Sequence, residues 1–164
     1  MIPLRTLCAG CLCLAAGIAA AEVRQGWVSW VMDGDTLLVV LDDQHEPVKV
    51  RIKDIDAPES CQPGGQASRD AMIDLVLRHR VQIERVSDDV YGRLVARVRR
   101  GELDLGAEMV RTGMAWAYHF KTGKGPYARL QRQAQQERIG LFSARETAMS
   151  PPVFRQFHGS CQLP

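Results

Sequence analysis

Residues 51–59 have the sequence Arg-Ile-Lys-Asp-Ile-Asp-Ala-Pro-Glu. At the start of this stretch Val48, Val50 and Ile52 alternate with charged residues, which is the period of a half-buried β-strand. Pro58 ends the strand, because proline has no N–H group to donate to a neighbouring strand. An arginine and two carboxylates therefore lie together where a strand leaves a sheet, a place where rigid folds often present functional groups. A charged strand that ends in a proline turn is the alternative interpretation.

Two further stretches add to this one. Residues 33–36 are Asp-Gly-Asp-Thr between two apolar runs, which alone is an ordinary hairpin signal. Residues 89–93 are Asp-Val-Tyr-Gly-Arg and open a later strand. Together with Arg-x-x-x-x-Asp-x-Pro-Glu at 51–59, these stretches resemble, in the same order, the motifs of the staphylococcal nuclease (thermonuclease) family. The resemblance covers residues 25–142, and the ordered set is far more specific than any single motif.

Hydrophobic periods and chain breakers predict five short strands, at 25–32, 36–41, 48–55, 80–86 and 94–99, and three helices, at 66–79, 104–112 and 126–139. Asp104 is expected to cap the second helix, and Gly113 to end it in a left-handed conformation. Pro126 is a favoured first-turn residue for the third helix. The pattern predicts an α+β fold. The resemblance implies a five-stranded OB-fold-type β-barrel with three packed α-helices.

The first segment is expected to be a leader that is removed. Arg5 precedes an apolar stretch that is too short to span a bilayer, and residues 19–21 are alanines, which fit a secretory cleavage site. We therefore predict a cleavable signal peptide at 1–21, a nuclease-like domain at 22–149 and a tail at 150–164. The protein would then be periplasmic or secreted. A buried N-terminal helix is the alternative.

The charge balance is nearly neutral. The formal net charge is +2, and it falls to +1 once Arg5 leaves with the leader. A protein that coats nucleic acid without specificity would be more basic, so attraction for phosphate must come from local clusters. The densest cluster is Arg93, Arg97, Arg99 and Arg100, although such a cluster is also common on a solvated strand face.

Two cysteines, Cys61 and Cys161, remain after the leader is removed. They cannot make a tetrahedral zinc site without histidines, and the four histidines are isolated in the sequence. Paired thiols rarely stay free in an oxidising compartment, so we predict a Cys61–Cys161 disulfide that holds the tail beside Glu59. Separate thiols or a bridge between two chains are the alternatives. The tail is expected to be irregular, but Phe154 and Phe157 indicate that it docks on the domain.

Phosphodiester hydrolysis requires an activated water, stabilisation of charge on the phosphoryl oxygens and help for the leaving oxygen. By the resemblance, Arg51 and Arg93 occupy the two catalytic arginine positions of the family. Arginine suits this task because its planar fork donates two parallel hydrogen bonds to phosphate. Glu59 matches the family's candidate general base. For each arginine, a structural ion pair is the alternative.

The resemblance also implies a calcium ion as cofactor. Asp35 and Asp56 match the family's metal carboxylates, and the backbone carbonyl of Ala57 would be a third ligand. Asp33 is expected to lie near the cation and to act indirectly. A site of oxygen ligands, few of them from protein, suits a hard cation that water and substrate complete. The residues alone would equally allow magnesium or manganese.

Three aromatic residues, Tyr91, Trp116 and Tyr118, are expected to contact bases and sugars, because aromatic faces stack on any base. Core packing is the alternative for Trp116 and Tyr118. The resemblance thus implies a metal-dependent hydrolase that cuts DNA and RNA with little sequence preference and leaves 3′-phosphate ends. It would be a monomer with no stable protein partner and no membrane span.

Two other functions fit the same fold. One is a non-catalytic OB-fold module that holds nucleic acid or a peptide, and the other is an envelope barrel that binds oligosaccharide. Non-catalytic relatives lose the carboxylates or arginines of the motifs. This chain keeps all of them, which favours the enzyme: Asp35, Arg51, Asp56, Glu59 and Arg93.

Overall fold

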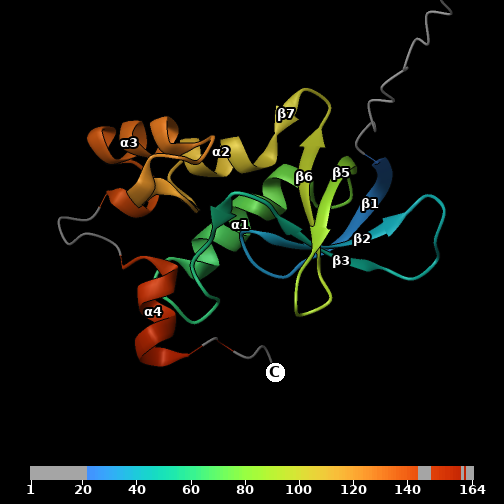
Figure 1. Ribbon diagram of the computed structural model, residues 1–164, viewed down its shortest axis with the longest axis horizontal. Helices are drawn as coiled ribbons and strands as arrows, with labels where there is room; N and C mark the ends of the chain where they lie inside the picture. The colour runs from blue at the N-terminus through green and yellow to red at the C-terminus, as the bar shows by residue number, and fades with distance from the viewer. Residues whose placement is uncertain (1–21, 144–148, 160, 162–164) are drawn as a thin grey trace, which may run out of the picture.

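The computed structural model describes residues 22–143, 149–159 and 161. The predicted leader at 1–21 lies outside the described residues, as does part of the predicted tail. Figure 1 shows a β-barrel toward one end of the molecule and most of the helices toward the other. Within the described ranges, no helix has both the length and the apolar character that crossing a membrane requires.

Five strands form the closed barrel that the sequence predicted. Their order is β3-β2-β1-β5-β6, and a parallel pairing of β3 with β6 closes the sheet. The strands are β1 (Val23–Val31), β2 (Thr36–Leu41), β3 (Val48–Ile52), β5 (Arg80–Asp88) and β6 (Leu94–Arg100). A short strand, β7 (Leu103–Asp104), extends the edge beside β6. Alternate residues of the barrel strands point inward and form a buried apolar core, so the barrel is filled rather than hollow.

The strand predicted at 48–55 is in fact two strands. β3 ends at Ile52, and Asp54 has a left-handed conformation with φ of 65°, which no regular strand accommodates. The chain then forms β4 (Ile55–Asp56), which pairs with β8 (Trp116–Ala117) outside the barrel. This change of direction carries Asp56 back over the end of β3.

The three predicted helices are present with shifted ends. They are α1 (Gly65–Val76), α2 (Leu105–Arg111) and α3 (Ala128–Glu137). α1 ends early because Arg78 is left-handed. Asp104 caps α2 as predicted, since its side chain accepts a hydrogen bond of 3.0 Å from the Ala107 N–H. Gly113 is left-handed as predicted. Two 3₁₀ turns, η1 (Phe120–Thr122) and η2 (Gly140–Phe142), flank α3.

The expectation of an irregular tail is wrong, because the tail contains α4 (Pro151–His158). Pro151 and Pro152 occupy the first turn of this helix, where a missing N–H removes no helical hydrogen bond. Phe154 is buried and docks the helix, whereas Phe157 is 70% exposed. The described residues therefore contain four α-helices rather than the three predicted.

The predicted disulfide is present. It joins Cys61, in the loop between β4 and α1, to Cys161, which follows α4, with the two Cα atoms 5.8 Å apart. The tail is thereby fixed beside the loop that contains Glu59.

Candidate active site

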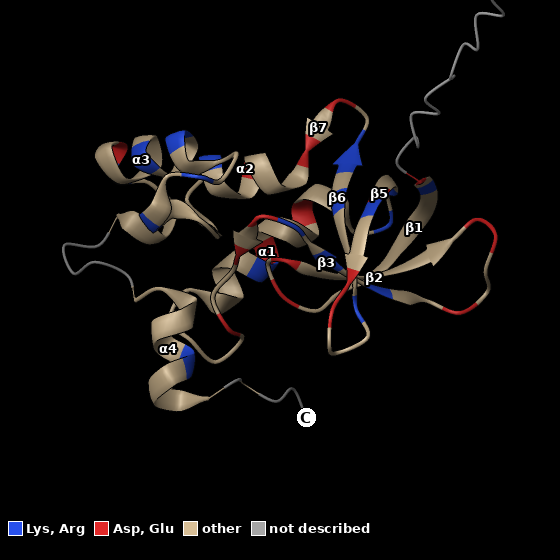
Figure 2. Ribbon diagram, viewed as in Figure 1, with Lys and Arg blue, Asp and Glu red and all other residues tan. Residues whose placement is uncertain are grey.

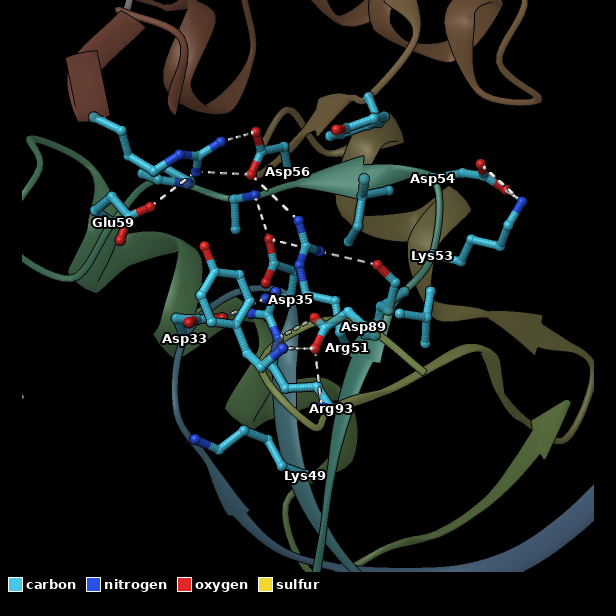
Figure 3. A pocket seen from close by; sticks show the side chains of 18 residues that line it. Asp33, Asp35, Lys49, Arg51, Lys53, Asp54, Asp56, Glu59, Asp89 and Arg93 are labelled. Carbon is cyan, nitrogen blue, oxygen red and sulfur yellow. Dashed lines mark hydrogen bonds and ion pairs between the residues drawn. The ribbon is translucent and has the colours of Figure 1, made fainter. Parts of the chain in front are cut away.

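A pocket of about 940 Å³ lies where the ends of β3 and β4 meet the β5–β6 loop and α4. Figure 3 shows acidic and basic side chains that converge on it from these separate segments. Figure 2 shows basic residues on β3 and on α4, and a further one that lines the pocket, Arg93, comes from the turn immediately before β6. The lining includes eight of the predicted site residues: Asp35, Arg51, Asp56, Ala57, Glu59, Tyr91, Arg93 and Tyr118.

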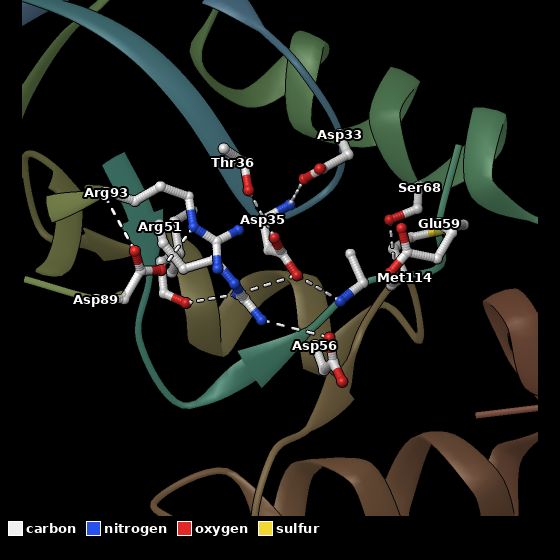
Figure 4. Close-up of polar contacts among 12 residues, drawn as sticks. Asp33, Asp35, Thr36, Arg51, Asp56, Glu59, Ser68, Asp89, Arg93 and Met114 are labelled. Carbon is white, nitrogen blue, oxygen red and sulfur yellow. Dashed lines mark hydrogen bonds and ion pairs between the residues drawn. The ribbon is translucent and has the colours of Figure 1, made fainter. Parts of the chain in front are cut away.

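Asp35 is the buried member of the turn between β1 and β2. Its Oδ1 accepts a hydrogen bond of 2.9 Å from Thr36 Oγ1, and its Oδ2 accepts one of 2.7 Å from the Ala57 N–H. Gly34 is required in this turn, because a Cβ atom there would collide with Ser68 Oγ on α1 (Figure 4). The Asp-Gly-Asp-Thr motif is therefore a tight turn that points one fixed carboxylate into the pocket.

Arg51 connects the two predicted metal carboxylates. Its Nη1 lies 3.0 Å from Asp35 Oδ2, and its Nη2 lies 3.3 Å from Asp56 Oδ1 (Figure 4). Nη1 also donates to the Ile52 carbonyl at 3.0 Å. The ion pairs that the sequence left as an alternative role for Arg51 are thus present, and they hold both carboxylates at one place.

Burial makes negative charge costly in this pocket. Desolvation, followed by repulsion from Asp35, raises the pKa of Asp33 to about 8. Desolvation also raises the pKa of Asp56, against a lowering by its hydrogen bond from Arg155. A cation placed among these carboxyl groups would relieve this cost.

The donor set fits a hard cation with few protein ligands. Within the described part of the chain, no group of three or more His, Cys, Asp or Glu side chains is arranged to hold a metal ion. The carboxylates of Asp35 and Asp56 nevertheless converge on one guanidinium, and Ala57 lines the same pocket. Two anionic oxygen donors suit calcium or a similar ion that keeps most of its water. The Arg155 guanidinium forms an ion pair with Asp56, which shows that this carboxylate can bind a positive charge.

The Asp-x-Tyr-Gly-Arg motif forms a turn that is held by hydrogen bonds among its own residues. The Asp89 side chain accepts hydrogen bonds from the N–H groups of Tyr91 and Arg93, at 2.9 and 3.0 Å, and from Arg93 Nε at 2.6 Å. Gly92 supplies the left-handed residue, with φ of 73°. Asp89 therefore aims Arg93 at the pocket, and the Arg93 guanidinium lies 5.4 Å from the centre of the Tyr91 ring.

Of the three aromatic residues predicted to contact the substrate, two line the pocket and one does not. Tyr91 and Tyr118 line the pocket and are 81% and 59% exposed, so each presents accessible ring surface for stacking. The prediction for Trp116 is wrong, because its ring is only 8% exposed and does not line the pocket. It packs edge-on against Phe142 at 5.5 Å, in a cluster with Ala134. Trp116 is a core residue.

Sequence reasoning missed Arg155, which comes from α4. Its Nη1 donates to Glu59 Oε1 at 2.9 Å and to Asp56 Oδ1 at 3.2 Å, and its Nη2 donates to Asp56 Oδ2 at 2.8 Å. Its hydrogen bond to Asp56 is the main cause of a pKa raised above the ordinary arginine value. The predicted disulfide was the available signal, since it placed the tail, and hence its one arginine, next to Glu59.

Two lysines of the pocket were also missed. Lys49, on β3, and Lys53, in the turn that follows β3, both line it, as does Arg51 between them. Lys53 is paired with Asp54 at 3.1 Å. The strand alternation that identified Val50 and Ile52 as core residues was the signal, because it puts residues 49, 51 and 53 on the opposite face.

Comparison with known proteins identifies similar chains over most of this length. The family model described as staphylococcal nuclease homologue matches residues 49–144. A protein of Shigella flexneri named micrococcal nuclease is 36% identical over 152 residues, which covers 85% of this chain and 85% of that protein. Protein ParB of Escherichia coli is 38% identical over 151 residues, covering 85% and 84%. An uncharacterized endonuclease of Haemophilus influenzae is 39% identical over 126 residues, covering 77% and 70%.

Proposed function

Because this chain belongs to the staphylococcal nuclease family, we propose that it is a calcium-dependent nuclease that acts outside the cytoplasm, on DNA and RNA, with little sequence preference. The chain is a nuclease of this family, and nucleic acids are its substrates. The identity of the cation, the 3′-phosphate products and the export of the protein are the parts that we propose.

One observation carries the proposal. The pocket brings together, from four separate segments, two carboxylates, two arginines and a third carboxylate that belong to the three sequence motifs. These are the groups that phosphodiester hydrolysis needs. Arg51 pairs with Asp35 and Asp56, Arg155 joins Asp56 to Glu59, and Arg93, which pairs with Asp89, lines the same pocket. A module that only bound nucleic acid would gain nothing from this cluster of buried acids.

The arginines would stabilise the charge that grows on the phosphoryl oxygens. Among the hydrogen bonds of the described residues, the Arg93 side chain uses only Nε, so both terminal nitrogen atoms remain for a phosphate. Arg51 holds Asp35 and Asp56 and adds a second positive charge at the same place. Each such preorganised donor is worth about 10²–10³ in kcat.

Glu59 would orient the attacking water and accept its proton, and a positioned base contributes about 10²–10⁴ in rate. A calcium ion held by Asp35, Asp56 and the Ala57 carbonyl would polarise the phosphoryl group and orient water. Attack at phosphorus with departure of the 5′-oxygen leaves a 3′-phosphate. The exposed rings of Tyr91 and Tyr118 would stack on bases of any identity, which gives little sequence preference.

The test is a cleavage assay with purified mature protein. Plasmid, single-stranded DNA and RNA are incubated with calcium, with magnesium or with excess chelator, and the products are separated on a gel. We expect cleavage of all three substrates with calcium and none with chelator. The fragments should accept a 5′-label from a polynucleotide kinase without prior phosphatase treatment, and a polymerase should extend them only after their 3′ ends are dephosphorylated.

The matched variant is Asp35→Asn, which keeps the side-chain shape and removes the charge. It should remain folded, because the amide oxygen can still accept from the Ala57 N–H and the amide NH2 can donate to the Thr36 hydroxyl, and it should behave like the chelated wild type. Full cleavage in excess chelator would exclude a metal-dependent reaction. Cell fractionation and N-terminal sequencing test export, and the expected mature chain begins at Glu22.

A further inference from the structure

The tail helix α4 is attached to the Glu59 loop on both sides. Before the helix, the Met149 carbonyl accepts a hydrogen bond of 2.6 Å from Gln62 Nε2. After it, Cys161 is bonded to Cys61, and the Cys61 N–H donates to Cys161 Sγ at 3.1 Å. The loop at 59–62 and the helix therefore form one joined unit, and the position of each fixes that of the other.

This attachment places Arg155 at the pocket. Arg155 is the one basic residue near the middle of α4, and its guanidinium spans the carboxylates of Asp56 and Glu59. Gln62 also fixes the backbone beside Glu59, since the Glu59 N–H donates to Gln62 Oε1 at 3.2 Å. Among the described residues, Arg155 is the only hydrogen-bonding partner of the Glu59 carboxylate.

The contact leaves Asp56 able to bind a cation. A carboxylate offers about four lone-pair sites. Oδ1 of Asp56 uses two of them, for Arg51 and Arg155, and Oδ2 uses one, for Arg155. The remaining site on Oδ2 can face a metal ion. Arg155 thus competes with a cation by charge, without occupying every donor atom.

The charge of Arg155 also changes the net charge of the pocket, and with it the attraction for a phosphodiester anion. Asp35, Asp56 and Glu59 carry three negative charges, which Arg51 and Arg155 reduce to a net of −1. A bound divalent cation brings this group to +1, which favours a phosphodiester anion. Without Arg155 the same loaded group would be neutral.

We propose that Arg155 is a positioning residue for the nuclease reaction. The doubly attached helix and the Cys61–Cys161 disulfide hold its guanidinium against Glu59, and this contact fixes the Glu59 carboxylate beside Asp56. The disulfide therefore supports activity through Arg155, in addition to its effect on stability. This inference rests on the proposed function, and it assigns a role to a tail that lies outside the three motifs.

The first experiment compares Arg155→Gln and Arg155→Lys with the wild type. Arg132→Gln is the matched control, because Arg132 is an exposed helical arginine on α3. Arg155→Gln should lower kcat about 10-fold, a fraction of the 10²–10⁴ that a positioned base supplies, with a change in KM below about 3-fold. Arg155→Lys should recover part of the loss in kcat, since lysine restores the positive charge but not the planar, bidentate geometry of the guanidinium. Arg132→Gln should match the wild type.

The second experiment is a calcium titration by calorimetry without nucleic acid. Removal of a positive charge next to Asp56 should tighten calcium binding by Arg155→Gln about 3- to 10-fold. Unchanged or weaker binding would show that the guanidinium does not lie on Asp56 in solution, and would overturn the proposal.

The third experiment is a double-mutant cycle with Cys61→Ser/Cys161→Ser. If the disulfide acts through Arg155, its removal should lower kcat about 10-fold in the wild type and less than about 2-fold in Arg155→Gln, because coupled changes are not additive. Both assays are run well below the melting temperature of the weakest variant. Fully additive losses would overturn the link between the disulfide and Arg155.

The outcomes separate this inference from the proposed function. If the wild type cleaves nucleic acid and Arg155→Gln cleaves it at the same rate, the inference is overturned and the proposed function is not. Faster cleavage by Arg155→Gln would also overturn it, and would assign Arg155 the opposite role of blocking the pocket. A wild type and an Arg132→Gln control that both fail to cut nucleic acid would overturn the proposed function itself.

Discussion

Replacement of Arg51 by methionine should cost both stability and activity, and the structure gives the size of each loss. Arg51 pairs with Asp35 at 3.0 Å and with Asp56 at 3.3 Å, and both carboxylates are nearly buried. Removal of one partner from a buried ion pair costs about 3–5 kcal/mol. The lower end applies here, because Asp56 keeps Arg155 and Asp35 keeps its hydrogen bonds from Ala57 and Thr36.

The expected fall in the melting temperature of Arg51→Met is about 10 °C at pH 7, since 1 kcal/mol corresponds to about 3–4 °C for a domain of this size. The kcat should also fall about 10² or more. Thermal unfolding followed by circular dichroism, in the absence of calcium, measures the first effect. The matched control is Arg97→Met, which removes an exposed ion pair of 2.9 Å with Glu84 and should shift the melting temperature by less than about 3 °C.

The stability difference between wild type and Arg51→Met should also depend on pH. Burial raises the pKa of Asp56 and the positive charge of Arg51 lowers it. Without Arg51, the Asp56 carboxyl therefore binds its proton more tightly in the folded state than in the unfolded state. Stability then falls as pH rises, and the difference from the wild type should be smaller at pH 4.5 than at pH 7. A melting temperature within 2–3 °C of the wild type at pH 7 would refute the view that Arg51 holds these carboxylates, since about 10 °C is expected.

Four other changes give distinct results. The pKa of Asp33 is raised from 3.8 to about 8 in the folded protein, so stability should fall as pH rises between these values, and Asp33→Asn should flatten that slope in urea unfolding measured without calcium. Tyr118→Ala should raise KM more than it lowers kcat. Trp116→Ala should instead lower the free energy of unfolding by about 3–5 kcal/mol and leave KM unchanged. Reduction of the Cys61–Cys161 bond, which closes a loop of 100 residues, should cost up to about 4.7 kcal/mol and lower the melting temperature by up to about 15 °C in a thermal melt with and without reductant.

The strands of the barrel were predictable from the sequence because the alternation that identifies each strand is local, whereas the barrel itself was implied by the family resemblance. Val50 and Ile52 face the core, and their spacing of two identifies the inward side of β3 without any knowledge of its neighbours. The break at Asp54 was not predictable in the same way. The alternation stops after Ile52, because Asp54 takes the next inward position and the buried Ile55 is out of phase. This change of phase does not show that Asp54 adopts a left-handed conformation.

The tail shows how one residue type can indicate opposite structures. The tail was expected to be irregular, and it contains Pro151 and Pro152. Proline breaks a helix when it lies in the interior, but at the first turn of α4 the two prolines are compatible with the helix. The position of a proline within a helix decides its effect, and a helix of only eight residues has too little hydrophobic period to reveal that position.

The candidate site was predictable where its residues belong to a motif and not where they meet through tertiary structure. Asp35, Arg51 and Arg93 follow from short ordered motifs and all line the pocket. Arg155 reaches the same pocket from a separate helix, and no sequence spacing relates it to Glu59. The prediction for Trp116 was wrong for another reason. An aromatic ring suits a core and a base-stacking surface equally well, and only its burial distinguishes the two.

The closing of the barrel has a consequence for folding. The parallel pair of β3 and β6 aligns Val50 with Leu94, residues that are far apart in the sequence, so its formation carries an entropic cost of loop closure. Arg51 lies on β3 and Arg93 immediately precedes β6, so this pair brings the two arginines together. A chain in which β3 and β6 have not paired therefore has no assembled phosphate site.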